Sequence, residues 1–207
     1  MPVQVKICGI TSPEDALLAA KAGASAVGLV FWPKSPRFVD RALARRIVEA
    51  LPTFIVRVGV FVDQSLDMMT RTSDDVGLDV IQLHGNEPPE MVACLPRRVL
   101  KAIKVDGELS PAAFAPYAGA GILLDSGGAA RPGGTGKTFD WRFAQSARAR
   151  LPFLALAGGL TPENVAQAIK VVGPDAVDVS SGVESSPGKK DAAKLRAFIE
   201  AVRSAGR

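Results

Sequence analysis

Several residues that can exchange protons stand where apolar runs of the sequence end. Lys6 and Cys8 close the first run, and Asp125 and Asp178 stand at the ends of two later runs. Thiols and carboxyls serve as general acids and bases, so such a set would suit proton transfer on a small substrate. Each residue alone has a simpler explanation, because Asp often caps the turn after a strand and a buried Cys packs as a small apolar group. Only their convergence at one place would favour catalysis.

The first of these runs shows the pattern most clearly. Residues 3–8 are rich in β-branched side chains and lead into Gly9, which indicates a short strand followed by a turn. Side chains alternate along a strand, so Lys6 and Cys8 share one face. A face of a buried strand that carries a cation and a thiol is unusual for a parallel sheet covered by helices.

The polar ends belong to a regular alternation of strands and helices. Eight apolar or β-branched segments are predicted to be strands, at residues 3–8, 26–31, 54–61, 79–84, 99–103, 121–125, 153–157 and 176–180. Helices are predicted at residues 13–23, 40–50, 65–76, after Pro88, at 111–117, from about 139, after the Thr161-Pro162 pair and at 190–204. Ser12 followed by Pro13 is typical of a capped helix start.

Eight strand–helix units without a linker predict a fold of the α/β class, a single (β/α)8 TIM barrel domain spanning residues 1–207. The alternative is an open doubly wound sheet, which more often has fewer strands and a glycine fingerprint at its first turn. The turn at Gly9 has no such fingerprint. In a barrel the active site lies at the carboxyl ends of the strands. The polar strand ends would then share one rim: Cys8, His84, Asp125, Asp178 and Ser180.

Composition argues against several other classes of protein. The chain has 207 residues, is 47% hydrophobic, carries a net charge of +4, and contains no apolar run of the about 18 residues that span a bilayer. Its scattered basic residues argue against nucleic-acid or membrane partners and suit an anionic small molecule. Cys8 and Cys94 make no disulfide framework and no signal peptide opens the chain, so a cytoplasmic location is expected. The sequence leaves a monomer or a homodimer open.

Three loops that contain glycine are candidate phosphate sites. Residues 131–138 form a glycine-rich segment whose backbone N–H groups could surround a phosphate, although the P-loop spacing is absent. Residues 157–161 and 180–184 follow the seventh and eighth strands, where barrels of this type often bind phosphate. Turn chemistry would explain the glycines but not the placement of two such loops together. We therefore expect a phosphorylated substrate.

The loop after the second strand is a candidate carboxylate site. It carries Lys34 and Arg37 between two prolines. An arginine offers a planar fork for bidentate pairing with a carboxylate, whereas a solvated surface loop is the simpler alternative. The neighbouring Phe31 and Trp32 could pack against an aromatic ring or within the core.

Short motifs recur in order along most of the chain. They are KICGIT at 6–11, SPR at 35–37, VGVFV at 58–62, QLHG at 82–85, LLD at 123–125, GGTG at 133–136 with FDW at 139–141, LAGGL at 156–160 and DVSSGVE at 178–184. In these motifs the chain resembles the phosphoribosylanthranilate isomerase family of tryptophan biosynthesis. The segment 87–120 shares little with that family beyond its pattern.

The resemblance implies an Amadori rearrangement of N-(5-phosphoribosyl)anthranilate, an aminoaldose, to 1-(2-carboxyphenylamino)-1-deoxyribulose 5-phosphate. It makes Asp125 the acid that protonates the furanose oxygen and Cys8 the base that removes the C2 proton. A free thiol ionises near pH ~8.5, so we expect the charge of Lys6 to favour the thiolate. Asp125 must hold a proton at neutral pH, and its neighbours Leu123 and Leu124 provide the apolar surroundings that favour the neutral acid.

The same resemblance implies the binding residues. Arg37 would bind the anthranilate carboxylate, Asp178 would accept a hydrogen bond from the amine or a sugar hydroxyl, and Lys6 belongs to the same substrate-binding set. Backbone groups of six residues would hold the phosphate: Gly134, Thr135, Gly158, Gly159, Ser181 and Gly182. His84 is expected to be a hydrogen-bonded support. No metal or organic cofactor is expected, because one histidine and two separated cysteines make no metal set.

Two other functions remain open at this point. The histidine-pathway sugar isomerase family resembles this fold and performs the same type of reaction, but it has Asp where this chain has Cys8 at the end of the first strand. A non-catalytic barrel that binds phosphorylated ligands is the second alternative. Such a binder needs neither the thiol nor the carboxyl at the rim.

Overall fold

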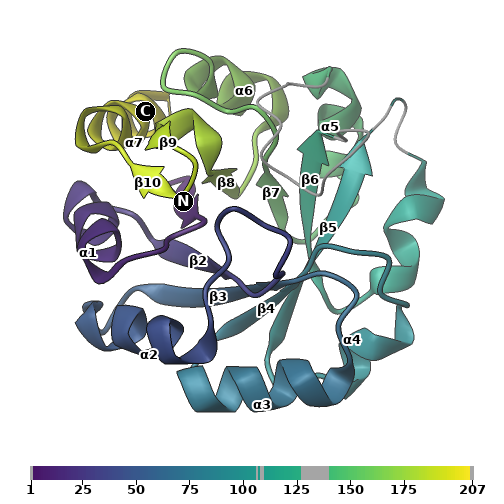
Figure 1. Ribbon diagram of the computed structural model, residues 1–207. Coiled ribbons are helices and arrows are strands. Elements are labelled where there is room, and N and C mark those ends of the chain that lie inside the picture. The colour runs from purple at the N-terminus through teal and green to yellow at the C-terminus, as the bar shows by residue number, and fades with distance from the viewer. Residues whose placement is uncertain (1, 106, 108–109, 127–139, 206–207) are drawn as a thin grey trace.

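The computed structural model describes residues 2–105, 107, 110–126 and 140–205. Eight parallel strands form a closed barrel in the order β1 to β8, and helices surround it (Figure 1). The barrel strands are β1 (Gln4–Cys8), β2 (Ala26–Val30), β3 (Val56–Phe61), β4 (Val80–Leu83), β5 (Arg98–Val105), β6 (Gly121–Ser126), β7 (Leu154–Leu156) and β8 (Ala176–Val179). The (β/α)8 barrel predicted from the alternation is confirmed.

The helices follow the strands around the outside of the barrel. They are α1 (Pro13–Ala22), α2 (Arg41–Ala50), α3 (Leu66–Val76), α4 (Glu90–Cys94), α5 (Trp141–Arg148), α6 (Val165–Val172) and α7 (Ala192–Ala205). Three short 3₁₀ turns are η1 (Pro111–Ala113), η2 (Ala115–Tyr117) and η3 (Ser181–Val183), and a two-stranded ribbon consists of β9 (Glu184–Ser186) and β10 (Lys189–Lys190). None of the helices in the described part of the chain has the length and apolar character needed to cross a membrane.

Local capping chemistry sets where α1 begins and ends. The Ser12 hydroxyl accepts a hydrogen bond from the backbone N–H of Asp15, and Pro13 takes the first helical position, where its missing N–H costs nothing. Gly23 ends the helix in the left-handed region at φ 109°. The predicted bounds of α1 are therefore confirmed.

Several predicted elements differ from the structure in their bounds or type. The third strand begins at Val56 rather than at residue 54, and Phe54 is 97% exposed. Residues 111–117 form two 3₁₀ turns instead of a helix. The Thr161-Pro162 segment is a turn, in which Asn164 Oδ1 accepts from the Thr161 N–H, so α6 begins only at Val165. Lys190 pairs with Glu184 in the β9–β10 ribbon, so the last helix begins at Ala192.

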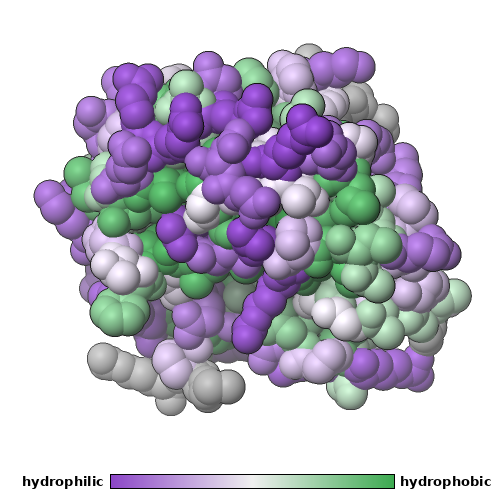
Figure 2. Space-filling view, turned by 90° about the horizontal axis from the view of Figure 1, so that it is seen from below, coloured by the Kyte–Doolittle hydropathy of each residue, from purple (hydrophilic) through white to green (hydrophobic). Residues whose placement is uncertain are grey.

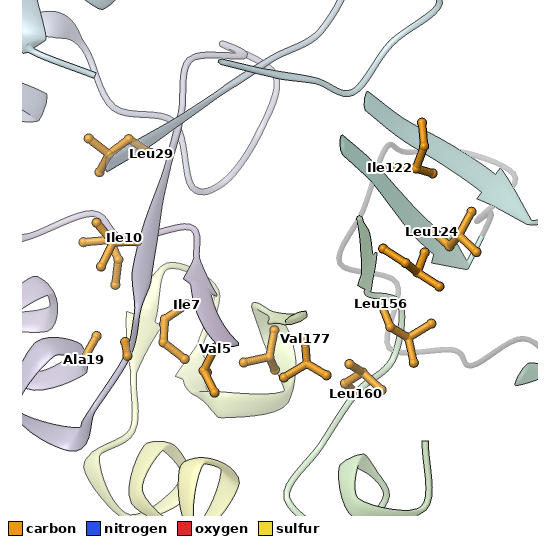
Figure 3. Close-up of a cluster of buried hydrophobic side chains, with 14 of the residues drawn as sticks. Val5, Ile7, Ile10, Ala19, Leu29, Ile122, Leu124, Leu156, Leu160 and Val177 are labelled. Atoms are coloured by element: carbon orange, nitrogen blue, oxygen red, sulfur yellow. The ribbon is translucent and has the colours of Figure 1, made fainter. Parts of the chain in front are cut away.

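Two layers of apolar side chains fill the barrel and its shell. The inner layer contains mostly small residues: Leu100, Ala102, Leu123, Ala155, Ala157 and Ala176. The outer layer lies between strands and helices and includes Ile7 from β1, Leu124 from β6 and Val177 from β8 (Figure 3). Figure 2 shows one outer face of the molecule, where hydrophilic residues cover much of the surface and hydrophobic residues gather across the middle.

The register of β1 with its two neighbours positions the residues at the start of the chain. Lys6 lies level with Asp178 on β8, and Cys8 lies level with Gly28 on β2. A Cβ atom on Gly28 would lie 2.8 Å from Cys8 Sγ, which is too close for any side chain. Gly28 therefore leaves the space that the sulfur occupies.

Candidate active site

The carboxyl ends of the strands enclose a cleft that contains most of the predicted site. Its walls carry two kinds of residue. The polar and glycine residues that line it are Cys8, Ser35, Arg37, His84, Asp125, Gly158, Gly159, Asp178, Ser180 and Ser181. The apolar residues are Val30, Trp32, Val60, Val62, Ala157, Leu160 and Val179. Cys8 and Asp125 face this one cleft from β1 and β6, which are not neighbouring strands.

The cation closest to Cys8 along the chain is already paired. Lys6 Nζ donates to Asp178 Oδ2 at 2.9 Å, and both side chains are buried, at 7% and 8% exposure. Burial lowers the pKa of Lys6, but the nearby Asp178 and Cys8 outweigh it, so the pKa of Lys6 is raised above its usual range. Lys6 therefore keeps its charge, and Asp178 neutralises that charge locally.

The Cys8 thiol has a pKa that is raised above its ordinary value. Burial is the largest cause, because it disfavours the thiolate. The positive charges of Lys6 and Lys190 lower the pKa of Cys8, whereas the negative charge of Asp178 raises it. The expected effect of Lys6 on the thiol thus has the right direction, but it does not overcome burial and the Asp178 carboxylate.

Asp125 lies beside the single histidine of the chain. Its side chain is 6% exposed, and its Oδ2 atom is 3.2 Å from His84 Nε2 without the alignment of a hydrogen bond. The other ring nitrogen, Nδ1, is 2.8 Å from Nε2 of the buried Gln82. Leu123 lies in the inner layer on the same face of β6 as Asp125, whereas Leu124 lies in the outer layer on the opposite face, so only Leu123 can contribute the expected apolar surroundings. His84 is thus held by Gln82 and lies next to Asp125.

Three polar atoms of the cleft residues form no hydrogen bond within the described part of the chain. These buried atoms are His84 Nε2, Asp178 Oδ1 and Ser180 Oγ. Leaving a buried polar atom unpaired costs about 1–3 kcal/mol, so such atoms at one cleft indicate a site that is completed by a ligand. Asp178 in particular keeps one oxygen on Lys6 and has the other available.

Arg37 is half-buried and already holds a carboxylate. Its Nε donates to Glu184 Oε1 at 2.8 Å and its Nη2 donates to Glu184 Oε2 at 2.7 Å. The predicted clamp is therefore not a free cation on a loop but an arginine fixed by a buried glutamate. Lys34, the other cation of the same loop, is exposed and does not line the cleft. Lys34 is therefore a solvent-exposed side chain of a surface loop and not part of a carboxylate site.

The two loops after β7 and β8 meet each other. Gly158 and Gly159 have positive φ angles of 85° and 63°, which favour glycine. A Cβ atom on Gly182 would lie 2.0 Å from the carbonyl oxygen of Leu160, so glycine at this position allows the loops to touch. Gly158, Gly159 and Ser181 line the cleft, whereas Gly182 does not line it and packs against Leu160 and Thr161. Gly134 and Thr135 lie outside the described residues.

The two aromatic residues after β2 have different positions. Phe31 is buried and stacks on Phe61 with a centroid separation of 5.1 Å, so it belongs to the core. Trp32 is partly exposed and lines the cleft. Of these two residues, only Trp32 is placed to pack against a bound ring.

Comparisons with known proteins agree with this geometry. The model of the N-(5'-phosphoribosyl)anthranilate (PRA) isomerase family matches residues 5–201. A protein of that name from Geobacter sp. (strain M21) is 52% identical over 196 residues, which is 95% of this chain and 96% of the relative. This chain belongs to the PRA isomerase family.

Solved structures of PRA isomerases share the fold over nearly the whole chain. The enzyme from Thermotoga maritima has a TM-score of 0.92 at 46% identity, covering 98% of this chain and 99% of that one. A complex of a PRA isomerase with reduced 1-(o-carboxyphenylamino)-1-deoxyribulose 5-phosphate has a TM-score of 0.89 at 44% identity with the same coverage. A third structure is described as a monomeric form generated from the dimeric Thermotoga maritima enzyme, with a TM-score of 0.87 at 43% identity, again covering 98% and 99%.

Sequence reasoning missed two residues that lie behind the cleft of this PRA isomerase family member and contact its lining. The Glu184 carboxylate accepts a hydrogen bond from Arg37, and Lys190 Nζ donates to the backbone carbonyl of Cys8. Neither residue was expected to have a role. A glutamate within the DVSSGVE motif, placed beside a candidate phosphate loop, was the available signal for Glu184. For Lys190 there was none, because Lys190 was predicted to begin the last helix, whereas it lies in the β9–β10 ribbon and is buried there.

Proposed function

We propose that this chain catalyses the isomerisation of N-(5'-phosphoribosyl)anthranilate to 1-(2-carboxyphenylamino)-1-deoxyribulose 5-phosphate, a step of tryptophan biosynthesis, in the cytoplasm. The observation that carries the proposal is that Cys8 and Asp125, from two separated strands, face one cleft that also contains Arg37. Family membership supports the same reaction. The substrate would bring a carboxylate, an amine, sugar hydroxyls and a phosphate to that cleft.

In this proposal, Asp125 protonates the furanose oxygen, and the ring opens to an iminium ion. Cys8, as the thiolate, then removes the proton from C2, which gives an enolamine that tautomerises to the ketone. One acid and one base suffice, and no redox partner is needed because C1 is reduced as C2 is oxidised. His84 lies within 3.2 Å of the Asp125 carboxylate and would orient it.

The remaining cleft residues would bind the substrate. The free Oδ1 of Asp178 would accept a hydrogen bond from the amine or a hydroxyl, and Lys6 would hold the other oxygen in place. Arg37 would bind the anthranilate carboxylate, and Trp32 would pack against the ring. The backbones of Gly158, Gly159, Ser181 and Gly182, with Gly134 and Thr135, would bind the phosphate.

The decisive experiment measures turnover of two aminoaldoses by the purified protein. One is N-(5'-phosphoribosyl)anthranilate of the tryptophan pathway, and the other is the corresponding substrate of the histidine-pathway isomerase. Isomerisation of the anthranilate substrate, together with rescue of a tryptophan auxotroph that lacks this step, is the expected result. Turnover of the histidine-pathway aminoaldose alone would reverse the assignment. Tight binding of the reduced product analogue without any turnover would instead favour a non-catalytic, ligand-binding barrel.

We further propose that the chain forms a homodimer through the amino-terminal face of its barrel. One relative is described as dimeric. On this face an apolar cavity of about 550 Å³ lies among the strand starts, lined by residues such as Val56, Val99 and Phe153, and Phe54 is 97% exposed nearby in sequence. Exposed apolar surface of this kind favours association. Size-exclusion chromatography with light scattering should show a dimer for the wild type and a shift to monomer for Phe54→Asp; a wild-type monomer would reject the proposal.

A further inference from the structure

A chain of three charges lies at the rim beside Cys8. Glu184 and Lys190 face each other across the β9–β10 ribbon, and the Glu184 carboxylate also receives Arg37. Lys190 Nζ donates to Glu184 Oε1 at 2.8 Å. The Glu184 side chain is 4% exposed and that of Lys190 is fully buried. Neither residue contributes a side chain to the cleft wall, so the proposed chemistry does not use them directly.

The way in which Glu184 binds Arg37 leaves one edge of the guanidinium available. An arginine has five N–H donors in a rigid fork. Glu184 takes one from Nε and one from Nη2, which is the side edge of the fork. The end edge, which consists of Nη1 and the second hydrogen of Nη2, has no partner among the described residues. Arg37 lines the cleft, so this end edge suits a second, incoming carboxylate.

The space for the Arg37 stem is also built into the rim. A Cβ atom on Gly9 would lie 2.3 Å from Arg37 Cδ, so only glycine at this position lets the stem cross the end of β1. The φ angle of Gly9 is +72°, which also favours glycine. The guanidinium is therefore restrained at two points, by Gly9 beneath its stem and by Glu184 along its side.

Lys190 prevents Glu184 from cancelling the charge of Arg37. Arg37 and Glu184 alone would form a neutral pair, but the formal charges of Arg37, Glu184 and Lys190 sum to +1. The other charge pair at the rim, Lys6 with Asp178, is neutral overall. Lys190 Nζ also donates to the carbonyls of Cys8 and Ser180, at 2.6 Å and 3.3 Å, and thereby ties this positive group to the seam between β1 and β8.

We propose that Glu184 is a positioning residue that orients the Arg37 fork toward the carboxylate of the substrate, while Lys190 keeps the group cationic. The inference rests on the proposed function and deepens it, because it assigns the recognition of the ring carboxylate to a three-residue unit. Preorganisation is the physical reason: an arginine already held in its bound orientation loses less side-chain entropy when the ligand arrives. The free Arg37 of a variant without Glu184 would have to be ordered by the ligand itself.

The test compares two ligands that differ only in the ring carboxylate. These are the reduced product analogue and its anilino counterpart, in which hydrogen replaces the carboxylate. In calorimetric titrations, Glu184→Gln should weaken binding of the carboxylate ligand by about ten-fold or more and that of the anilino ligand by less than about two-fold. In turnover, the KM of the substrate should rise by a larger factor than kcat falls. Equal weakening of both ligands, or weakening of neither, would overturn the inference.

A second variant protects the test against misfolding. Glu184→Gln leaves two buried cations without their anion, which is destabilising. The double variant Glu184→Gln with Lys190→Met removes one charge of each sign, and it should fold while showing the same carboxylate-selective loss. If the double variant bound the carboxylate ligand as tightly as the wild type, Glu184 would have no positioning role. Wild-type turnover is measured in the same series, so failure of the proposed reaction is distinguishable from failure of this inference.

Discussion

Lys6 Nζ and Asp178 Oδ2 lie 2.9 Å apart across the seam where β8 closes the barrel against β1. This pair decides how much of the Lys6 charge acts on Cys8, two residues further along β1. Burial is the main reason that the pKa of the Cys8 thiol stays above its usual range, and the negative charge of Asp178 raises it further against the lowering effect of Lys6. A residue near the opposite end of the chain therefore contributes to the charge environment of the proposed base.

Asp178→Asn should lower the pKa of Cys8. The negative charge of Asp178 raises that pKa, and its removal also leaves the charge of Lys6 uncompensated. The rate of alkylation of Cys8 by iodoacetamide is measured as a function of pH in proteins that also carry Cys94→Ser. The pH at which this rate increases should be lower for Asp178→Asn than for the protein that retains Asp178. Lys6→Met is the matched control, and it should shift the profile in the opposite direction. Identical profiles for both variants would show that these charges do not act on the thiol.

Cys8→Ala and Asp125→Asn should each lower kcat by about 100-fold or more, since each removes one proton-transfer group. Neither substitution adds volume at the rim, so circular dichroism and thermal unfolding should show an intact fold. Turnover is measured by the loss of the aminoaldose. A variant that retained near-normal kcat would not have lost its acid or base, and the role of that residue would be wrong.

Arg37→Ala should raise the KM of the substrate strongly and change the free energy of unfolding little. Glu184 would still be paired with Lys190 at 2.8 Å, so the buried carboxylate is not left without a cation. Initial-rate kinetics and urea unfolding provide the two numbers. Lys34→Ala is the control, because Lys34 is an exposed cation on the same loop. If both variants had unchanged KM and kcat, the carboxylate clamp would be rejected.

Gly182→Ala should weaken binding of the phosphate group. The added Cβ would lie 2.0 Å from the Leu160 carbonyl oxygen, so the loops after β7 and β8 must separate. Competitive inhibition by inorganic phosphate should become weaker by about ten-fold, which corresponds to about 1.4 kcal/mol. Gly173→Ala is the control: its φ is +63° and an added Cβ would meet no neighbouring atom within 4 Å, so it should cost stability but leave phosphate inhibition unchanged. An equal effect of both substitutions on inhibition would contradict the placement of the phosphate site.

Glu87→Gln should destabilise the protein by about 3–5 kcal/mol, because it breaks a buried ion pair and leaves the buried charge of Lys101 without its anion. Glu87 and Lys101 have side chains that are 1% and 4% exposed and lie 2.7 Å apart. The Glu87 carboxylate also accepts hydrogen bonds from the backbone N–H groups of Asp63 and Gly85. Chemical denaturation measures the loss.

The control for this stability prediction is Glu87→Gln combined with Lys101→Met. This pair of substitutions removes both charges, so it should recover part of the stability that the single variant loses. A single variant as stable as the wild type would mean that the pair contributes nothing.

Local patterns along the chain were enough to predict the architecture and most of the rim. The alternation of apolar strands with capped helices predicted the (β/α)8 barrel, because both periodicities and capping chemistry are local properties of the chain. The polar strand ends predicted where Cys8, Asp125 and Asp178 would meet, since every parallel strand of a barrel ends at the same face. The motif of Ser12 and Pro13 likewise placed the first helix.

The pairing of the charges, in contrast, became visible only in three dimensions. The pairs of Lys6 with Asp178 and of Arg37 with Glu184 join residues 172 and 147 positions apart in the chain. No local pattern reports such distances, because they depend on how the barrel closes and on the register at the closing seam. Lys190 enters the same network through a ribbon whose pairing is also a tertiary event. The amino-acid sequence thus specified the groups available for catalysis, and the closure of the barrel set their charge environment.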